Sequence, residues 1–196
     1  MSNDCRRRAA CKRVALVMVA AAGLGTAAAQ AESFTLGYSV GFLTDPFQAI
    51  QVDLTMAQAK EAGLKTLPVA NANGDAGKQI TDFHNLIAQG AQGIIVVPTD
   101  SDAIAPALNY ASDQGVPVVA IDIGPAGGKA AMIVRADNLR MGADACQQMG
   151  KALGGKGTVL SMMGDQATTN GRDRTTGFNE CPSGVSAYST RGGTTG

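Results

Sequence analysis

Apolar residues along the chain form two kinds of run, short β-branched runs and longer runs at helical spacing. In residues 93–102, four β-branched residues from Ile94 to Val97 follow a glycine and stop at Pro98, which predicts a strand buried on both faces. A polar turn then leads into a helix starting near Asp102, with an apolar stripe at Ala103, Ile104, Leu108 and Ala111. A second buried strand over 117–121 ends on Asp122. This succession predicts a βαβ unit, whose ligands bind beyond the carboxyl ends of the strands.

The same alternation precedes this unit. Strands are expected over 34–40 and 65–70, and Pro68 places the second at a sheet edge. A helix over 47–62 is expected to turn Phe47, Ile50, Leu54 and Ala57 inward, and the next helix to bury Ile80, Phe83 and Ile87. Residues 34–121 therefore predict an α/β fold, a doubly wound parallel sheet with helices on both faces and right-handed crossovers.

The pattern continues after Asp122 and then stops. It predicts a strand over 131–134, a helix over 139–153, a strand over 158–163 and a helix carrying Arg172, Arg174 and Phe178. Beyond Cys181 the residues are mostly small, polar or glycine and show no periodicity, so a disordered tail is expected over 182–196.

The first 31 residues have the composition of a targeting segment. A basic start is followed by an eleven-residue apolar run over 14–24 and by Ala29-Gln30-Ala31. This order predicts a secretory signal peptide over 1–31, cleaved after Ala31, and hence an exported protein. The alternative is a membrane anchor, but eleven residues fall well short of the ~20 that span a bilayer.

The charge balance and the cysteines limit which kinds of ligand the chain is expected to bind. Five basic residues and one acidic residue lie before position 14, so removing the signal leaves 11 basic and 15 acidic residues. A mildly acidic domain without a basic patch is not expected to bind nucleic acid. Cys146 and Cys181 remain, and their spacing leaves a disulfide and two separately packed thiols equally open. His84 is the only histidine, and no Cys/His cluster indicates a metal.

Polar residues at the predicted strand ends are the candidate site. The set suits a neutral polyol, because carboxylates accept hydrogen bonds from hydroxyls, a guanidinium donates to them and an aromatic face covers a sugar ring. Its members are Asp45, Phe47, residues 99–102, Asp122, Asp137, Asn138 and Arg172. The alternative is that each only caps a helix or ends a strand, as expected for Asp100 and Asp102. No nucleophile motif and no phosphate-binding glycine loop is present, so neither an enzyme nor a cofactor is expected.

Five motifs in order resemble one known family. They are Thr44-Asp-Pro-Phe47, Pro98-Thr-Asp-Ser-Asp-Ala-Ile104, Val118-Val-Ala-Ile-Asp122, Ala136-Asp-Asn138 and Gly171-Arg-Asp-Arg-Thr-Thr-Gly-Phe178. Together they resemble the periplasmic sugar-binding proteins of ABC importers, the ribose/galactose-binding group with lobes like those of LacI-type repressors. The resemblance covers residues 34 to about 181.

The resemblance implies two lobes around a cleft, joined by a hinge of three crossing strands. Residues 32–135 would form the first lobe and 136–181 part of the second. Ligand contacts are implied for Asp45, Phe47, Asp122, Arg172 (the first arginine of its motif) and, at the hinge, Asp137. Gln48 and Ile123 replace an aromatic and an arginine of the ribose-binding pattern, which leaves another pentose, a hexose or a polyol open. The implied partners are a membrane permease and a chemoreceptor.

Other readings remain open on the sequence alone. A LacI-like regulator would need a DNA-binding headpiece where the signal peptide stands, and an enzyme would need the missing nucleophile or cofactor motif. The family continues through a full second lobe, so this sequence is expected to be C-terminally truncated. A non-functional fragment of such a receptor is therefore the alternative to a working sugar receptor. The truncated chain is expected to bind sugars only weakly.

Overall fold

The computed structural model describes residues 34–181 and 185–190, so the predicted signal peptide lies outside the described residues. A six-stranded sheet forms the first part of the fold, in the order β2-β1-β4-β5-β6 with β3 also paired to β1. Every pairing in it is parallel, as predicted. The strands are β1 Thr35–Val40, β2 Lys65–Thr66, β3 Ala70–Asn71, β4 Gly93–Val96, β5 Val118–Ile121 and β6 Met132–Val134.

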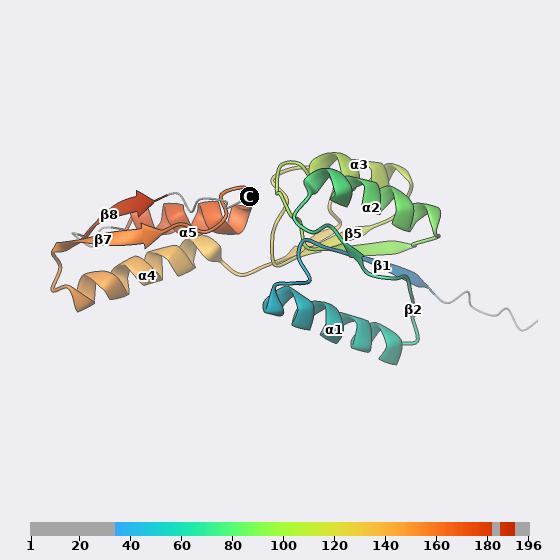
Figure 1. Cartoon of the computed structure of the whole chain (residues 1–196), viewed down its shortest axis with the longest axis horizontal. Coiled ribbons are helices and arrows are strands. Elements are labelled where there is room, and N and C mark those ends of the chain that lie inside the picture. Colours follow the sequence, from blue (N-terminus) through green and yellow to red (C-terminus); the bar gives the residue numbers. More distant parts are fainter. Residues whose placement is uncertain (1–33, 182–184, 191–196) are drawn as a thin grey trace, which may run out of the picture. The chain divides into compact units, whose positions relative to one another are not determined.

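Helices cover both faces of this sheet (Figure 1). Helices α2 (Ala76–Ala88) and α3 (Ala105–Asp113) pack Phe83 and Leu108 onto one face, in a buried cluster with Ile94 and Val118. Helix α1 (Pro46–Glu61) packs Val52 onto the other face, in a cluster with Tyr38, Val40 and Val97. The strand order reverses between β1 and β4, and in doubly wound sheets this switch point is where ligands bind.

The buried side of α1 differs from the prediction. Phe47, Ile50 and Leu54 are exposed, and the helix instead buries Gln48, Val52 and Ala59. Gln48 is buried because its side-chain oxygen accepts a hydrogen bond from the Phe42 backbone N–H at 3.0 Å. A polar residue thus occupies a position that hydrophobic periodicity assigns to the surface.

Two other boundaries shift for identifiable reasons. The strand predicted over 65–70 is split into β2 and β3 around Pro68, which cannot donate to a ladder. Both pieces pair only with β1, so the edge position is confirmed. Helix α3 starts at Ala105 rather than near Asp102, because the Asp100 carboxylate accepts from the N–H groups of Asp102 and Ala103 and holds a turn there.

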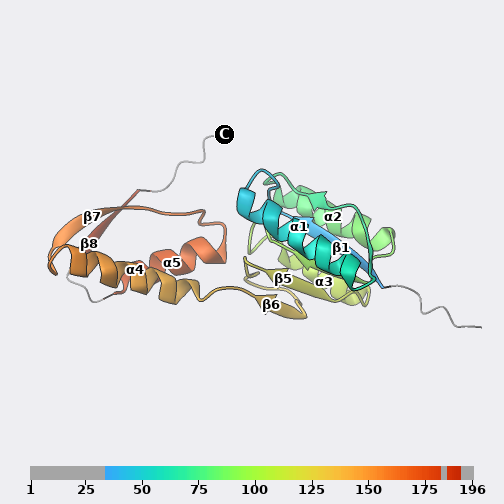
Figure 2. The ribbon, with the colours of Figure 1, turned by 90° about the horizontal axis from the view of Figure 1, so that it is seen from below.

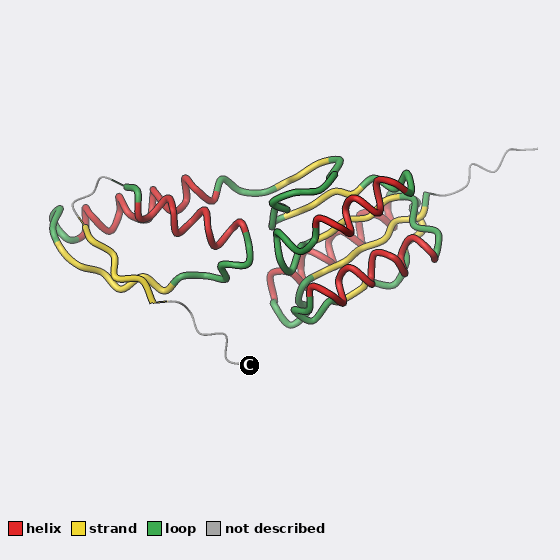
Figure 3. The backbone as a smooth tube through the Cα atoms, turned by 90° about the horizontal axis from the view of Figure 1, so that it is seen from above, coloured by secondary structure: helices red, strands yellow, loops and turns green. Residues whose placement is uncertain are grey.

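A second α/β layer follows β6. Helices α4 (Asn138–Ala152) and α5 (Thr169–Asn179) lie side by side (Figures 2 and 3). Strands β7 (Gly157–Met162) and β8 (Val185–Thr190) form a two-stranded sheet of their own, which contacts α4 through β8. Strand β8 pairs in parallel with β7. Leu160 and Met162 of β7 are 65% and 86% exposed.

Strand β8 corrects the expectation of a disordered tail over 182–196. The segment 185–190 contains a valine, a tyrosine and a threonine without glycine or proline, and such residues favour strands when a partner edge is available. β7 supplies that edge. The rest of the predicted tail, 182–184 and 191–196, lies outside the described residues.

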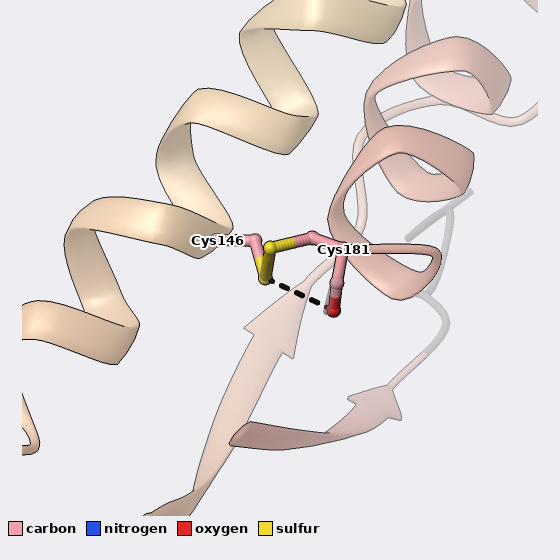
Figure 4. Close-up of a disulfide and its surroundings, with 2 residues drawn as sticks. All are labelled: Cys146 and Cys181. Carbon is pink, nitrogen blue, oxygen red and sulfur yellow. Dashed lines mark hydrogen bonds between the residues drawn. A yellow bond between two sulfur atoms is a disulfide. The ribbon is translucent and has the colours of Figure 1, made fainter. Parts of the chain in front are cut away.

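A disulfide settles the question that cysteine spacing left open. Cys146 of α4 and Cys181, directly after α5, are joined, with their Cα atoms 6.2 Å apart (Figure 4). The bridge spans 35 positions of sequence and ties the two helices together. Among residues 34–181 and 185–190, no helix is long and apolar enough to cross a bilayer.

Candidate functional site

A pocket of about 870 Å³ lies at the carboxyl ends of β1, β4 and β5, at the switch point of the sheet. The loops after these strands form one wall, and α4, the end of β7 and α5 form the other. Its polar and charged lining includes Asp45, Gln48, Thr99, Asp122, Asp165, Asn170 and Arg174, and its apolar lining includes Phe42, Phe47, Met141, Met162 and Phe178.

The start of α1 places two of the predicted residues on this pocket. Asp45 is the N-cap, and its carboxylate accepts from the Phe47 N–H at 2.9 Å. Pro46 fixes the first helical position, so the Phe47 ring projects from the first turn. That ring is 59% exposed, which leaves a large apolar face free to cover a ligand.

Asp122 holds the centre of the site in an uncommon backbone conformation. Its φ is 61°, and the Ile123 N–H donates to the Ile121 carbonyl at 2.8 Å, which closes a tight turn around it. Asp and Asn adopt this left-handed region more readily than most residues. The turn directs the carboxylate towards Asn170, whose side-chain nitrogen donates to it at 3.2 Å.

Burial raises the pKa of the Asp122 carboxyl above its ordinary value, and the nearby Asp45 carboxylate acts in the same direction. The hydrogen bond from Asn170 and the positive charges of Arg174 and Arg135 act against this increase. The ionised carboxylate at Asp122 is therefore held at the expense of stability.

Replacing Asp122 by asparagine is expected to raise the free energy of unfolding near neutral pH. Because the folded-state pKa is raised, wild-type stability falls as pH rises from the ordinary carboxyl range through the folded-state value. Asparagine removes that loss and keeps both the backbone conformation and the acceptor for Asn170. Urea denaturation at about pH 7 and about pH 3 measures the effect. D122N should gain relative to wild type only at the higher pH, and an equal effect at both would contradict the assignment.

The two arginines of α5 face different surroundings. Arg174 lines the pocket, and its Nε donates to Asn138 Oδ1 at 2.7 Å. Arg172 is not among the lining residues: its guanidinium donates to the carbonyls of Gln166 and Ala167 and pairs with Asp102 at 3.1 Å. The family resemblance implied the first arginine of the motif, Arg172, as the ligand contact, whereas the structure places the second, Arg174, on the pocket.

Asp137 is likewise placed away from the pocket lining. It is the N-cap of α4, and its carboxylate accepts from the Arg140 N–H at 2.9 Å. Of the five residues predicted as ligand contacts, the structure thus brings together Asp45, Phe47 and Asp122. Thr99, which belongs to the predicted polar turn 99–102, and Asn170, which was not predicted, also line the pocket.

A hydrogen-bonded network attaches the start of α5 to the loops after β4 and β5. The Ser101 hydroxyl donates to the Gly124 carbonyl at 2.7 Å and accepts from the Thr169 N–H at 2.9 Å. The Thr169 hydroxyl donates to the same carbonyl at 2.8 Å. Arg135 adds contacts to Thr169 and Asp173. These contacts hold α5, and with it Arg174, at the edge of the first sheet.

The chemistry of the pocket favours recognition of a neutral polar molecule. The carboxylates of Asp45, Asp122 and Asp165 accept hydrogen bonds, the Arg174 guanidinium and the side-chain amides donate, and aromatic rings supply apolar faces. Among the described residues, no group of three or more His, Cys, Asp or Glu could hold a metal ion.

Comparison with known proteins relates the chain to extracytoplasmic receptors. A family model described as "Periplasmic binding protein domain" matches residues 36–192. The ribose import binding protein of Bacillus subtilis is 35% identical over 147 residues, which cover 75% of this chain and 48% of that protein. A xylitol-binding protein of Mycolicibacterium smegmatis is 30% identical over 148 residues, covering 74% of this chain and 41% of that protein.

Solved structures give the same relationship. An ABC transporter solute-binding protein from Mycobacterium smegmatis with bound glycerol has a TM-score of 0.74 at 30% identity, covering 80% of this chain and 55% of that one. The myo-inositol-binding protein of Caulobacter has a TM-score of 0.70 at 28% identity, covering 79% and 55%. The chain spans about half the length of the curated relatives that it matches.

Proposed function

Because the chain belongs to the periplasmic binding protein family, we propose that its pocket binds a monosaccharide or polyol for an ABC importer. The observation that carries this proposal is the meeting of Asp45, Phe47, Asp122 and Arg174 at the switch point of the parallel sheet. Relatives that bind ribose, xylitol and myo-inositol support the ligand class.

Each side chain has a defined role in this proposal. The carboxylates of Asp45 and Asp122 accept hydrogen bonds from ligand hydroxyls, and Arg174 donates to them from the opposite wall. The Phe47 ring covers the apolar face of the ligand. Arg172 and Asp137 act indirectly, Arg172 by pairing with Asp102 and Asp137 by capping α4. Delivery to a membrane permease, and docking on a chemoreceptor, complete the proposed role.

A titration followed by nuclear magnetic resonance tests the ligand class. Isotope-labelled protein is titrated with D-ribose, xylitol, myo-inositol and D-galactose, because chemical shifts report binding from micromolar to millimolar affinity and locate it. At least one compound should shift the amides of Asp45, Phe47, Asp122 and Arg174 in a saturable manner. Saturable shifts confined to another surface, or none with any of the four compounds, would overturn the proposal.

We also propose that the chain is exported and cleaved after Ala31. The basic start, the apolar run of eleven residues and Ala29-Gln30-Ala31 motivate this, and the family itself is periplasmic. Protein expressed in a bacterium with a periplasm should be recovered from that compartment with Glu32 as its first residue. An uncleaved product retained in the cytoplasm would contradict the assignment.

A further inference from the structure

Two asparagines connect Arg174 and Asp122, which lie on opposite walls of the pocket. At one end, Arg174 Nε donates to Asn138 Oδ1 at 2.7 Å. Asn138 Nδ2 donates to Asn170 Oδ1 at 2.9 Å. At the other end, Asn170 Nδ2 donates to Asp122 Oδ1 at 3.2 Å. Asn138 and Asn170, here called the amide bridge, therefore link the two charged pocket groups by successive hydrogen bonds.

The charged groups at its two ends fix the direction of the amide bridge. A guanidinium only donates hydrogen bonds, so the Asn138 oxygen must face Arg174 and its nitrogen must face Asn170. An ionised carboxylate only accepts, so the Asn170 nitrogen must face Asp122. The structure meets both requirements at once. Reversing either amide would place two donors together at one of its bonds and two acceptors together at the other.

Both amides are buried at the starts of the two helices of the second layer. Asn138 is the first residue of α4 and is 1% exposed, and Asn170 lies in the first turn of α5 and is 7% exposed. Asn138 Nδ2 also donates to the Ala136 carbonyl at 3.1 Å, so both of its N–H groups are used. A buried amide that lost one of these partners would leave a polar atom unpaired, which is unfavourable. The amide bridge therefore has one favourable arrangement.

This arrangement holds the two pocket groups before a ligand binds. An arginine side chain has many rotamers, and ordering it only on binding lowers affinity. The bond from Arg174 Nε to Asn138 removes part of that cost, and the Asn170 amide holds the Asp122 carboxylate in the same way. Binding groups that are locked by hydrogen bonds behind them keep a productive geometry. The alternative is that the asparagines only join the starts of α4 and α5, which predicts no effect on the pocket.

We propose that Asn138 and Asn170 are positioning residues, which hold Arg174 and Asp122 in place for the ligand through one directional set of hydrogen bonds. This inference rests on the proposed function and deepens it. Neither asparagine has to touch the ligand, because each acts through the charged neighbour that it holds. A change at Asn170 should therefore be detectable at Arg174, to which it is connected through Asn138.

Two substitutions at Asn170 test the amide bridge in the ligand-free protein. Asn170→Ala removes both of its bonds, whereas Asn170→Asp keeps the acceptor for Asn138 and loses the donor to Asp122. The readout is the Arg174 Nε–H signal in the nuclear magnetic resonance spectrum of isotope-labelled protein. N170A should shift this signal and speed its exchange with water. N170D should keep the wild-type behaviour, because the half of the bridge that ends at Arg174 is intact.

Sugar binding measures what the amide bridge contributes to the site. With the tightest-binding of D-ribose, xylitol, myo-inositol and D-galactose, N170A and N170D should each weaken binding about five- to ten-fold, the value of one hydrogen bond. Both variants should fold, because alanine favours helices and an acidic residue suits a first helical turn. Asn179→Ala, at the exposed last position of α5, is the matched control and should change neither the Arg174 signal nor the affinity.

Three results would each overturn the positioning role: an unchanged Arg174 signal in N170A, an equal loss of that signal in N170A and N170D, or unchanged affinity in both variants. If N170A does not fold, N170D decides alone, since it must lower the affinity while keeping the Arg174 signal. If wild type binds none of the four sugars, the proposed function fails for these ligands and the positioning role with it. The Arg174 signal of the free variants then still shows whether the bridge joins the two pocket groups.

Discussion

Replacing Gly177 of α5 by alanine is expected to lower the free energy of unfolding by about 3 kcal/mol, at the upper end of overpacking effects. A Cβ at this position would run into the backbone carbonyl of Leu139 and lie 3.0 Å from the Ala143 nitrogen. The contact is reciprocal, since a Cβ on Gly142 of α4 would meet the Arg174 carbonyl and lie 2.9 Å from the Phe178 nitrogen. Backbone cannot move aside as a flexible side chain can, so α4 and α5 would have to separate.

Gly77 provides the matched control for this prediction. It is an exposed glycine in the first turn of α2, where a Cβ would approach only the end of the Asp75 side chain at 3.2 Å. Gly77→Ala should therefore leave stability unchanged or raise it by up to about 1 kcal/mol through lower unfolded-state entropy. Urea denaturation followed by circular dichroism measures both variants. Equal effects of G77A and G177A would show that the helices are not in backbone contact.

The second large effect is expected at Arg174. Arg174→Gln should weaken sugar binding about ten- to a hundred-fold, the value of a charge-assisted hydrogen bond of roughly 1.5–3 kcal/mol. The Nε contact to Asn138 orients the guanidinium on the pocket wall, opposite Asp122. Titration with the tightest-binding of D-ribose, xylitol, myo-inositol and D-galactose measures the loss.

Arg172→Gln is the control, because it removes the same charge two residues earlier on the same helix. In its pair with Asp102 the aspartate side chain is 70% exposed and the arginine 36%, and pairs open to solvent contribute about 0.2–1 kcal/mol. Binding should fall by less than about five-fold. A larger loss for R172Q than for R174Q would mean that the first arginine contacts the ligand, as sequence analysis predicted. The two variants therefore decide between the two assignments.

The arginine pair also shows what a motif can and cannot specify. The sequence places both residues on one helix, but a helix turns about 100° per residue, so two positions apart face nearly opposite directions. Packing decides which side of α5 faces the pocket. Gly177 and Gly142 bring the α5 backbone against α4, and in this arrangement Arg174 lines the pocket. The hydrophobic periodicity of α5 does not predict this backbone contact with α4, so it does not indicate which arginine lines the pocket.

Fold class was predictable because the strands of the first sheet are short and strongly apolar and the helices between them are punctuated by glycine and proline. The buried face of α1 was not predictable, because it includes Gln48, a polar residue whose side chain bonds to the Phe42 backbone. Strand β8 was not predictable either, because it forms by pairing with β7, which is distant in sequence, and because its own residues are mostly polar. In each case the missing information lies in a partner distant in sequence or in a single polar contact.

The Cys146–Cys181 bridge has a consequence for handling the protein. Because it closes a covalent ring that contains the end of α4, β7 and α5, a protease cut anywhere between these two cysteines opens the ring without releasing a fragment. A nicked molecule keeps its mass on a denaturing gel, apart from the water added by hydrolysis, until a reductant separates the pieces. Paired gels with and without reductant therefore distinguish intact chains from nicked ones.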